Sequence, residues 1–151
     1  MKAKADFLEL PNRLKTLAVD QTPKWGIMTP QHMVEHIIGT WRISNGRARV
    51  APAASGDELD RRRAFIFSDV AYQKNITNPV FGDGLMKLRK PNLQAAIDHL
   101  EDEMTAFFEY HESNQEAMEA HPVFGILDYN GWIVFQSKHM GHHLAQFEID
   151  F

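Results

Sequence analysis

The sequence predicts an all-α fold, a four-helix bundle with one long crossover loop, in a single domain over residues 1–151. Apolar residues recur at spacings of three and four in four separate segments, which places them on one face of a helix. Nothing alternates like strands for long enough to build a sheet. Amphipathic helices of this kind bury their apolar faces against one another in a bundle.

The first two helices differ in how clearly their starts are marked. Apolar positions before residue 20 predict a first helix, which Pro11 must either start or interrupt. The second helix is predicted over 30–45, because Thr29 can cap its free amide groups and Pro30 suits the first helical position. Its inward stripe includes Met33 and His36, and Asn-Gly ends it.

Three further segments complete the pattern. Ser55 and Glu58 have the spacing of a capping box, which predicts a short helix through Phe67. Residues 68–91 contain Asn, Gly and Pro and predict a long connection that covers a site or crosses the end of the bundle. Residues 92–111 carry the strongest helical period, and a last helix is predicted from about 128 to about 147.

Composition excludes several classes of protein. The 151 residues include no cysteine, so a disulfide scaffold, a thiolate zinc site and a cysteine nucleophile are ruled out. The net charge of −4 argues against binding to nucleic acid, which needs a basic surface. The chain shows no signal peptide and no apolar run long enough to span a membrane, so we expect a cytoplasmic protein.

Four histidines lie in two pairs, each at a spacing of four: His32 with His36, and His139 with His143. Two imidazoles at this spacing lie on one side of a helix and can chelate one ion. His36 shares the inward stripe of its helix, so it can supply a third ligand to the pair on the last helix. Three neutral imidazoles suit Zn²⁺, Ni²⁺ or Fe²⁺. The alternative is that these histidines simply pack or face solvent.

The other histidines are predicted to lie outside the site. His32 is expected as an exposed residue of the first helical turn, and His142 projects about 100° away from its neighbour at position 143. His111 continues a core stripe and is predicted either to hydrogen-bond a ligand or to fray. His99 and His121 are predicted to be structural, the latter in a turn.

The segments 23–36 (PKWGIMTPQHMVEH) and 138–147 (KHMGHHLAQF), together with 121–125 (HPVFG), resemble the DinB-like/YfiT-like metalloenzyme superfamily. The resemblance implies up-down-down-up topology and one metal ion held by a histidine of the second helix and two of the last, which match His36, His139 and His143. It also implies kinship with transferases and isomerases that use mycothiol, bacillithiol or glutathione. One departure is Glu148, where members commonly have glycine.

Three functions follow as hypotheses. The first is a metal-dependent enzyme for a small molecule, in which the ion lowers the pKa of a bound thiol or water to give transferase or hydrolase chemistry. The second is a non-enzymatic bundle that binds a metal or small ligand. The third is a metal-free bundle in which exposed apolar residues such as Trp25 or Phe81 support a homodimer. A homodimer is compatible with all three hypotheses.

Proton transfer in such an enzyme needs a further group near the ion. Glu35, Glu109 and Glu148 are candidates, and each is equally well explained as a surface charge. The sequence assigns none of them.

Overall fold

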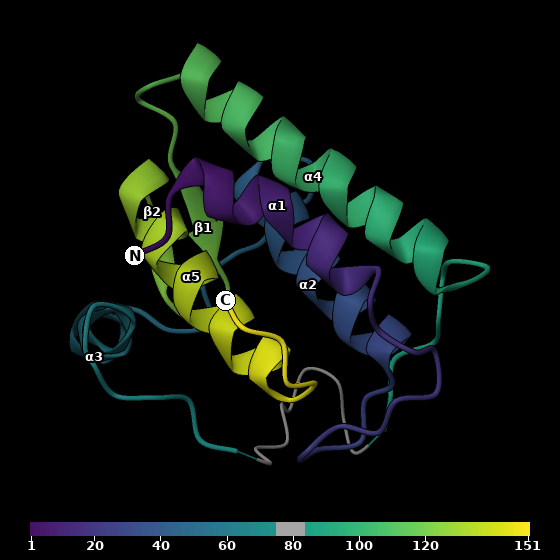
Figure 1. Ribbon diagram of the computed structural model, residues 1–151. Coiled ribbons are helices and arrows are strands. Elements are labelled where there is room, and N and C mark those ends of the chain that lie inside the picture. The colour runs from purple at the N-terminus through teal and green to yellow at the C-terminus, as the bar shows by residue number, and fades with distance from the viewer. Residues whose placement is uncertain (75–83) are drawn as a thin grey trace.

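The computed structural model describes residues 1–74 and 84–151 of the chain. The described part contains five helices and two short strands (Figure 1). In chain order the elements are α1 (Lys4–Leu14), α2 (Pro30–Ser44), α3 (Gly56–Ile66), α4 (Leu93–Ser113), β1 (Glu119–His121), β2 (Gly125–Leu127) and α5 (Tyr129–Ala145). The mainly helical fold is therefore confirmed.

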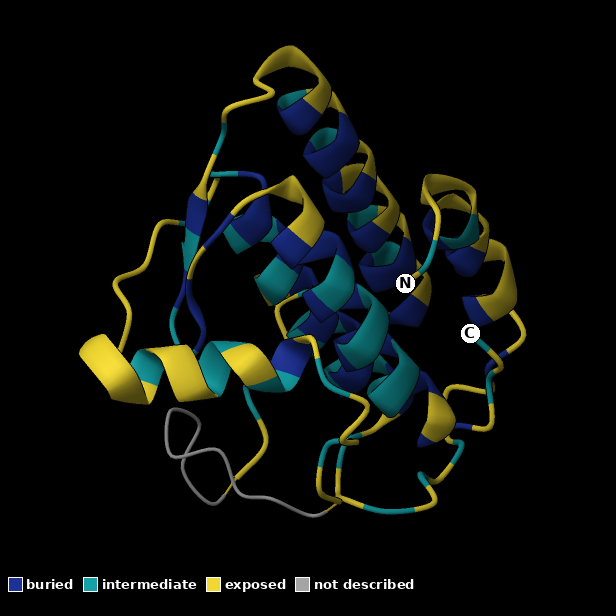
Figure 2. Cartoon of the chain, turned by 90° about the vertical axis from the view of Figure 1, so that its left-hand side faces the viewer, coloured by how far each residue is buried: buried dark blue, intermediate teal, exposed yellow. Residues whose placement is uncertain are grey.

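Helix α4 packs against both α1 and α2, and α5 packs against α2 and α3. Helix α3 runs in a different direction from the other helices: it is seen almost end-on in Figure 1 and lies crosswise in Figure 2. The helices turn their buried faces inward, whereas α3 is mostly exposed (Figure 2). The up-down-down-up order of a four-helix bundle remains a prediction.

Aromatic and aliphatic side chains fill the space between the helices. Phe7 of α1 packs edge-on against Trp41 of α2 at 5.3 Å between ring centroids, and Trp41 meets Phe107 of α4 at 5.1 Å. Each such side chain contributes about 1.5–3 kcal/mol by leaving water. The largest fully buried side chains are Trp41, Trp132, Phe7, Phe107, Phe108, Phe135, Phe147, Leu10, Leu14, Met33, Ile37 and Ile66.

The expectation that no segment forms a sheet was wrong. Strands β1 and β2 pair antiparallel, with His121 opposite Gly125. The Nδ1 atom of His121 accepts hydrogen bonds from the backbone amides of Val123 and Phe124 at 3.0 and 3.3 Å, which fixes the turn between the strands. Strands of three residues are too short to show an alternating pattern.

Of the two helix caps predicted from the sequence, the one at Thr29 is confirmed and the one at Ser55 is not. The side chains of Thr29, Asn92 and Asp128 accept hydrogen bonds at the starts of α2, α4 and α5. The predicted capping box at Ser55 was wrong, because that residue starts α3 without a side-chain cap. Pro11 neither starts nor breaks α1 but lies inside it.

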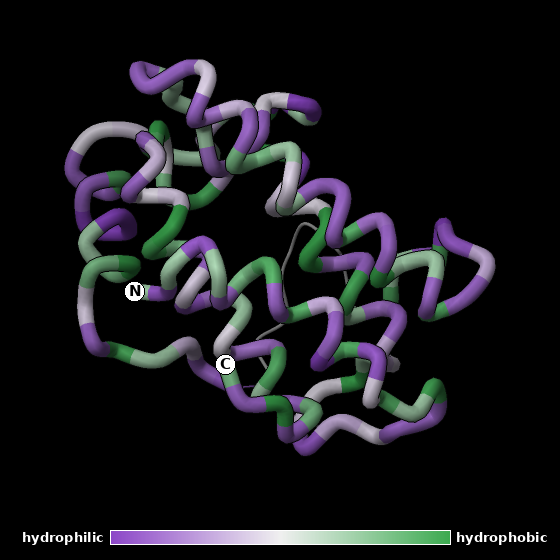
Figure 3. The backbone as a smooth tube through the Cα atoms, turned by 45° about the horizontal axis from the view of Figure 1, so that its top comes forward, coloured by the Kyte–Doolittle hydropathy of each residue, from purple (hydrophilic) through white to green (hydrophobic). Residues whose placement is uncertain are grey.

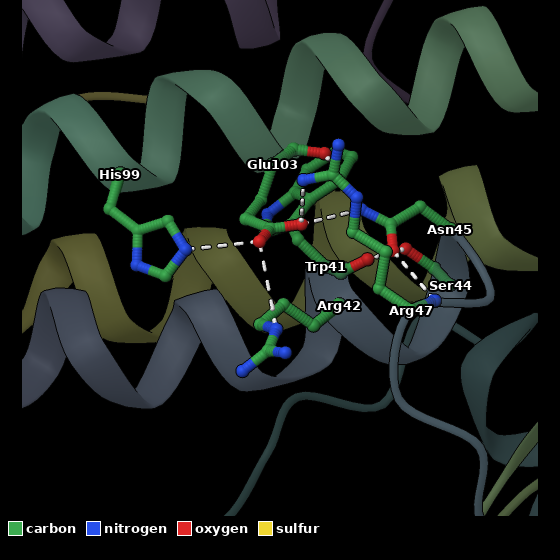
Figure 4. Close-up of polar contacts among 7 residues, drawn as sticks. All are labelled: Trp41, Arg42, Ser44, Asn45, Arg47, His99 and Glu103. Atoms are coloured by element: carbon green, nitrogen blue, oxygen red, sulfur yellow. Dashed lines mark hydrogen bonds and ion pairs between the residues drawn. The ribbon is translucent and has the colours of Figure 1, made fainter.

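A buried carboxylate joins the end of α2 to α4 (Figure 4). Glu103 is 3% exposed and accepts hydrogen bonds from Asn45 at 2.7 Å, Arg47 at 3.1 Å and His99 at 3.0 Å, with Arg42 at 3.6 Å. Burial raises the pKa of Glu103, but the hydrogen bonds from Asn45 and His99 and the charge of Arg47 lower it overall. The carboxylate therefore stays ionised and clamps the two helices together.

No helix among the described residues is long and apolar enough to cross a membrane. Hydrophilic residues recur along the helices between the hydrophobic ones (Figure 3).

Candidate metal centre

The three predicted ligands come together between α2 and α5. The Nε2 atom of His139 lies 3.1 Å from Nε2 of His36 and 3.1 Å from Nε2 of His143. The ligand atoms of the three residues all lie within 4.8 Å of one another, so these residues could hold a metal ion. His36, His139 and His143 are called the histidine triad below.

The tautomer of His143 is set by its neighbours. The side-chain amide of Gln146 donates from Nε2 to the backbone carbonyl of Trp25 at 3.1 Å, which turns its Oε1 toward His143. That oxygen accepts a hydrogen bond from Nδ1 of His143 at 2.7 Å. Because a neutral imidazole carries one N–H, the Nε2 of His143 presents a lone pair to the centre of the triad.

With His143 in this tautomer, the triad has too few N–H groups to make a hydrogen bond at each of its nitrogen–nitrogen contacts. Nε2 of His139 lies 3.1 Å from the Nε2 atoms of both His36 and His143, and the Nε2 of His143 presents a lone pair rather than an N–H. A single N–H makes only one linear hydrogen bond, so the two contacts cannot both be satisfied by protons. With His36 and His139 in the same tautomer as His143, a cation would satisfy all three Nε2 atoms, since nitrogens bound to zinc at about 2.0–2.1 Å lie about 3.3 Å apart at tetrahedral angles.

Burial keeps the triad uncharged at neutral pH. Burial lowers the pKa of His36 to about 4 and that of His143 to about 3, helped by neighbouring histidines. The pKa of His139 falls well below its ordinary value, first because of burial and then because of His143 and His36. Metal binding requires neutral imidazoles, so no proton has to be removed from the triad at pH 7.

The Trp25-Gly26 dipeptide explains how Gln146 is held. Gly26 has a φ of +80°, which side chains other than hydrogen rarely allow, and a Cβ there would lie 3.0 Å from Nε2 of Gln146. The backbone amide of Lys24 also donates to the carbonyl of Gln146 at 2.7 Å. The chain before α2 therefore fastens the residue that orients His143.

Tyr72 lies against the triad and was not found from the sequence. Its ring is 6.2 Å from that of His139 and 5.4 Å from that of His142. Its hydroxyl is buried and has no hydrogen-bond partner among the described residues. Burial raises the pKa of Tyr72 above its ordinary value, so the hydroxyl keeps its proton. No periodicity marks the irregular segment after α3, so the sequence carries no signal for this position.

Lys138 brings this segment against α5. Its ammonium group donates to the backbone carbonyls of Phe65 at 2.9 Å and Ser68 at 2.7 Å. It also lies over the Phe65 ring at 4.2 Å. Carbonyl groups at the C-terminal end of a helix attract a cation, so the residue before His139 ties the end of α3 to the triad helix.

The remaining histidines take other roles. His32 contacts the capping hydroxyl of Thr29 at 2.6 Å, and His99 pairs with Glu103. His111 is buried and donates from Nε2 to the carbonyl of Ser44 at 3.0 Å, so it neither frays nor binds a ligand through that atom.

His121 and His142 also fall outside the triad. His121 is structural, as predicted, because its ring is buried against Phe135 at 4.4 Å between centroids. His142 is half-buried and packs against Trp25 at 5.6 Å. Trp25 was expected to be exposed, but it is half-buried, and Phe81 lies outside the described residues.

The three candidate glutamates serve elsewhere. Glu35 accepts hydrogen bonds from the backbone amides of Arg89 at 2.8 Å and Lys90 at 3.0 Å, and so holds the chain before α4 against α2. Glu109 is exposed on α4. Glu148 is exposed and pairs with Lys24 at 3.0 Å.

Fold and site together define a helical protein with a buried cluster of three histidines that could bind one metal ion. The model of the DinB superfamily matches residues 2–147, and the chain belongs to that superfamily. No curated protein and no solved structure shows significant similarity to the chain. The resemblance noted in the sequence is thus confirmed at the level of the family.

Proposed function

We propose that this protein is a metal-dependent enzyme in which His36, His139 and His143 bind one divalent transition-metal ion. The observation that carries the proposal is the meeting of three neutral imidazole nitrogens whose contacts protons alone cannot satisfy. Membership of the DinB superfamily supports it. Zn²⁺, Ni²⁺ and Fe²⁺ are the candidate ions, because each accepts imidazole ligands.

The roles of the residues follow from the geometry. Three protein ligands leave a coordination position open, and a bound ion would lower the pKa of water or a thiol there. His36 and His143 are partly buried, whereas His139 is buried, so the access of small molecules to the triad is through His36 and His143. Gln146 orients His143, and the ring of Phe135 stacks on His139 at 5.0 Å between centroids, which restricts its rotation.

Two reactions on a small molecule fit this centre. Activation of a low-molecular-weight thiol gives a transferase, and activation of water gives a hydrolase. Turnover measured with and without added thiol separates them, since only the transferase requires it.

A non-enzymatic role in binding a metal or small ligand is the second candidate, and the burial of His139 at 8% exposure favours it. Cobalt-substituted protein titrated with 2-mercaptoethanol distinguishes the two. An enzyme with an open position should show a thiolate-to-cobalt charge-transfer band, which His139→Ala should abolish. Bound cobalt with an unchanged spectrum would contradict the enzyme proposal and favour the closed site.

Other features stay predictions of the sequence. They are the single domain, the cytoplasmic location, the lack of a nucleic-acid partner and the homodimer. Sedimentation at high protein concentration tests the last of these.

A further inference from the structure

An open depression with a volume of about 410 Å³ lies beside the histidine triad. It is lined by Trp25, Tyr72, Lys74, Lys138 and His142, together with three small residues. Two of its walls touch the triad, because the His142 ring lies 5.1 Å from that of His143 and the Tyr72 ring 6.2 Å from that of His139. A molecule in the depression is therefore one side chain away from the triad. The volume suits a small molecule.

The walls favour a flat ligand that accepts hydrogen bonds. The His142 ring stands 5.6 Å from that of Trp25 and 5.4 Å from that of Tyr72, so three rings border the space. The indole N–H of Trp25 and the hydroxyl of Tyr72 are both buried without a partner among the described residues. Each can donate a hydrogen bond, and a buried donor left unmatched is costly.

The charge of the lining is positive. Lys74 places its ammonium 4.2 Å from the centroid of the Trp25 ring, where it takes up one face of the indole. Lys138 adds a second positive charge, held by the carbonyls of Phe65 and Ser68, and no carboxylate is among the described residues that line the depression. Aromatic rings can also bind a cationic ligand, but two lysines would repel one.

We infer that this depression binds the substrate, and that the substrate is a small molecule with a planar, conjugated body and an anionic group such as a carboxylate. Lys74 pairs with the anionic group, and Tyr72 donates a hydrogen bond to the ligand. That the bound molecule is a substrate rests on the proposed function. The binding itself requires only the lining residues.

Benzoate tests the inference, with benzamide as the neutral planar ligand and cyclohexanecarboxylate as the non-planar anion. Each is titrated into metal-free full-length protein, so that a carboxylate bound to an ion is not mistaken for this site. Binding is followed through the indole N–H resonance of Trp25 by NMR. We expect benzoate to shift this resonance and to bind at least fivefold more tightly than either comparison ligand.

Three variants assign the contacts. Lys74→Gln should weaken benzoate binding at least tenfold, whereas Lys15→Gln, at an exposed lysine of the segment after α1, should leave it unchanged. Tyr72→Phe should weaken it about threefold or more with the fold intact, because the hydroxyl has no protein partner to lose among the described residues. Equal binding of benzamide, or an unchanged affinity in Lys74→Gln, would overturn the inference.

The test separates the two proposals. Benzoate binding at Trp25 in a protein that takes up no metal would leave the inference standing as a binding site and refute the metal-dependent function. Metal uptake at the triad with no benzoate shift at Trp25 would refute the inference alone.

Discussion

Oε1 of Gln146 lies 2.7 Å from Nδ1 of His143, and this hydrogen bond fixes which nitrogen of His143 faces the triad. Gln146→Ala should therefore weaken metal binding by about 10–100-fold, the usual cost of losing a group that orients a ligand. Competition with a chromophoric chelator measures the affinity. Gln115→Ala, at an exposed position, is the control and should change nothing. Equal affinities in the two variants would contradict this role.

Gly26→Ala should destabilise the protein by about 1–2 kcal/mol, because the residue has a φ of +80° and its new Cβ would crowd the amide of Gln146. Gly39→Ala is the matched control: it lies inside α2 with nothing within 4 Å of the added carbon and should stabilise by about 0.5–1 kcal/mol. Urea unfolding measures both. Opposite signs are expected, and a neutral Gly26→Ala would show that the tight approach is unimportant.

Glu103→Gln should destabilise by about 1.5–3 kcal/mol, because the carboxylate is 3% exposed and accepts charged hydrogen bonds that an amide cannot replace. Glu101→Gln, exposed on the same helix, should change stability by less than about 0.5 kcal/mol. Metal stoichiometry should stay that of the wild type in both, because Glu103 bonds to the end of α2 rather than to the triad. Loss of metal in Glu103→Gln would show that the contacts between Glu103 and the end of α2 also position the histidine triad.

The buried His121 should make the free energy of unfolding depend on pH. Burial lowers its pKa to about 3, and its Nδ1 accepts two backbone hydrogen bonds that protonation would break. The unfolded residue binds a proton near pH 6.5, so its stabilising contribution is complete above that pH and falls as the pH drops toward 3, by up to about 1.4 kcal/mol per pH unit.

Metal-free wild type and His121→Phe, unfolded in urea between pH 7.5 and 4, test this dependence. The free energy of unfolding of the wild type should fall relative to that of the variant as the pH falls. A difference in unfolding free energy that stays constant with pH would contradict it.

The sequence predicted the features that recur along a helix. Thr29 marked the start of α2, the helical periods placed the starts of α4 and α5 near residues 92 and 128, and the spacing of four between His139 and His143 placed both on one face of α5. Gln146 was within reach of the same reasoning, since a residue three positions after His143 lies on that face as well.

The features that depend on tertiary contacts could not be predicted in this way. Strands β1 and β2 have three residues each, and their turn is held by His121 rather than by a common turn sequence. Tyr72 lies in irregular chain whose place is set by Lys138 from a distant helix. Neither arrangement produces a periodic pattern of apolar residues in the sequence.

The central claim is that His36, His139 and His143 bind one metal ion. Elemental analysis of protein purified without an affinity tag or chelator tests it most directly, with His36→Ala, His139→Ala and His143→Ala beside the wild type and His32→Ala as the control. We predict about one equivalent of a transition metal in the wild type and in the control, lost in the three triad variants while their helical signal persists. A wild type that contains no metal, even after reconstitution with Zn²⁺, Ni²⁺ or Fe²⁺, would contradict the claim.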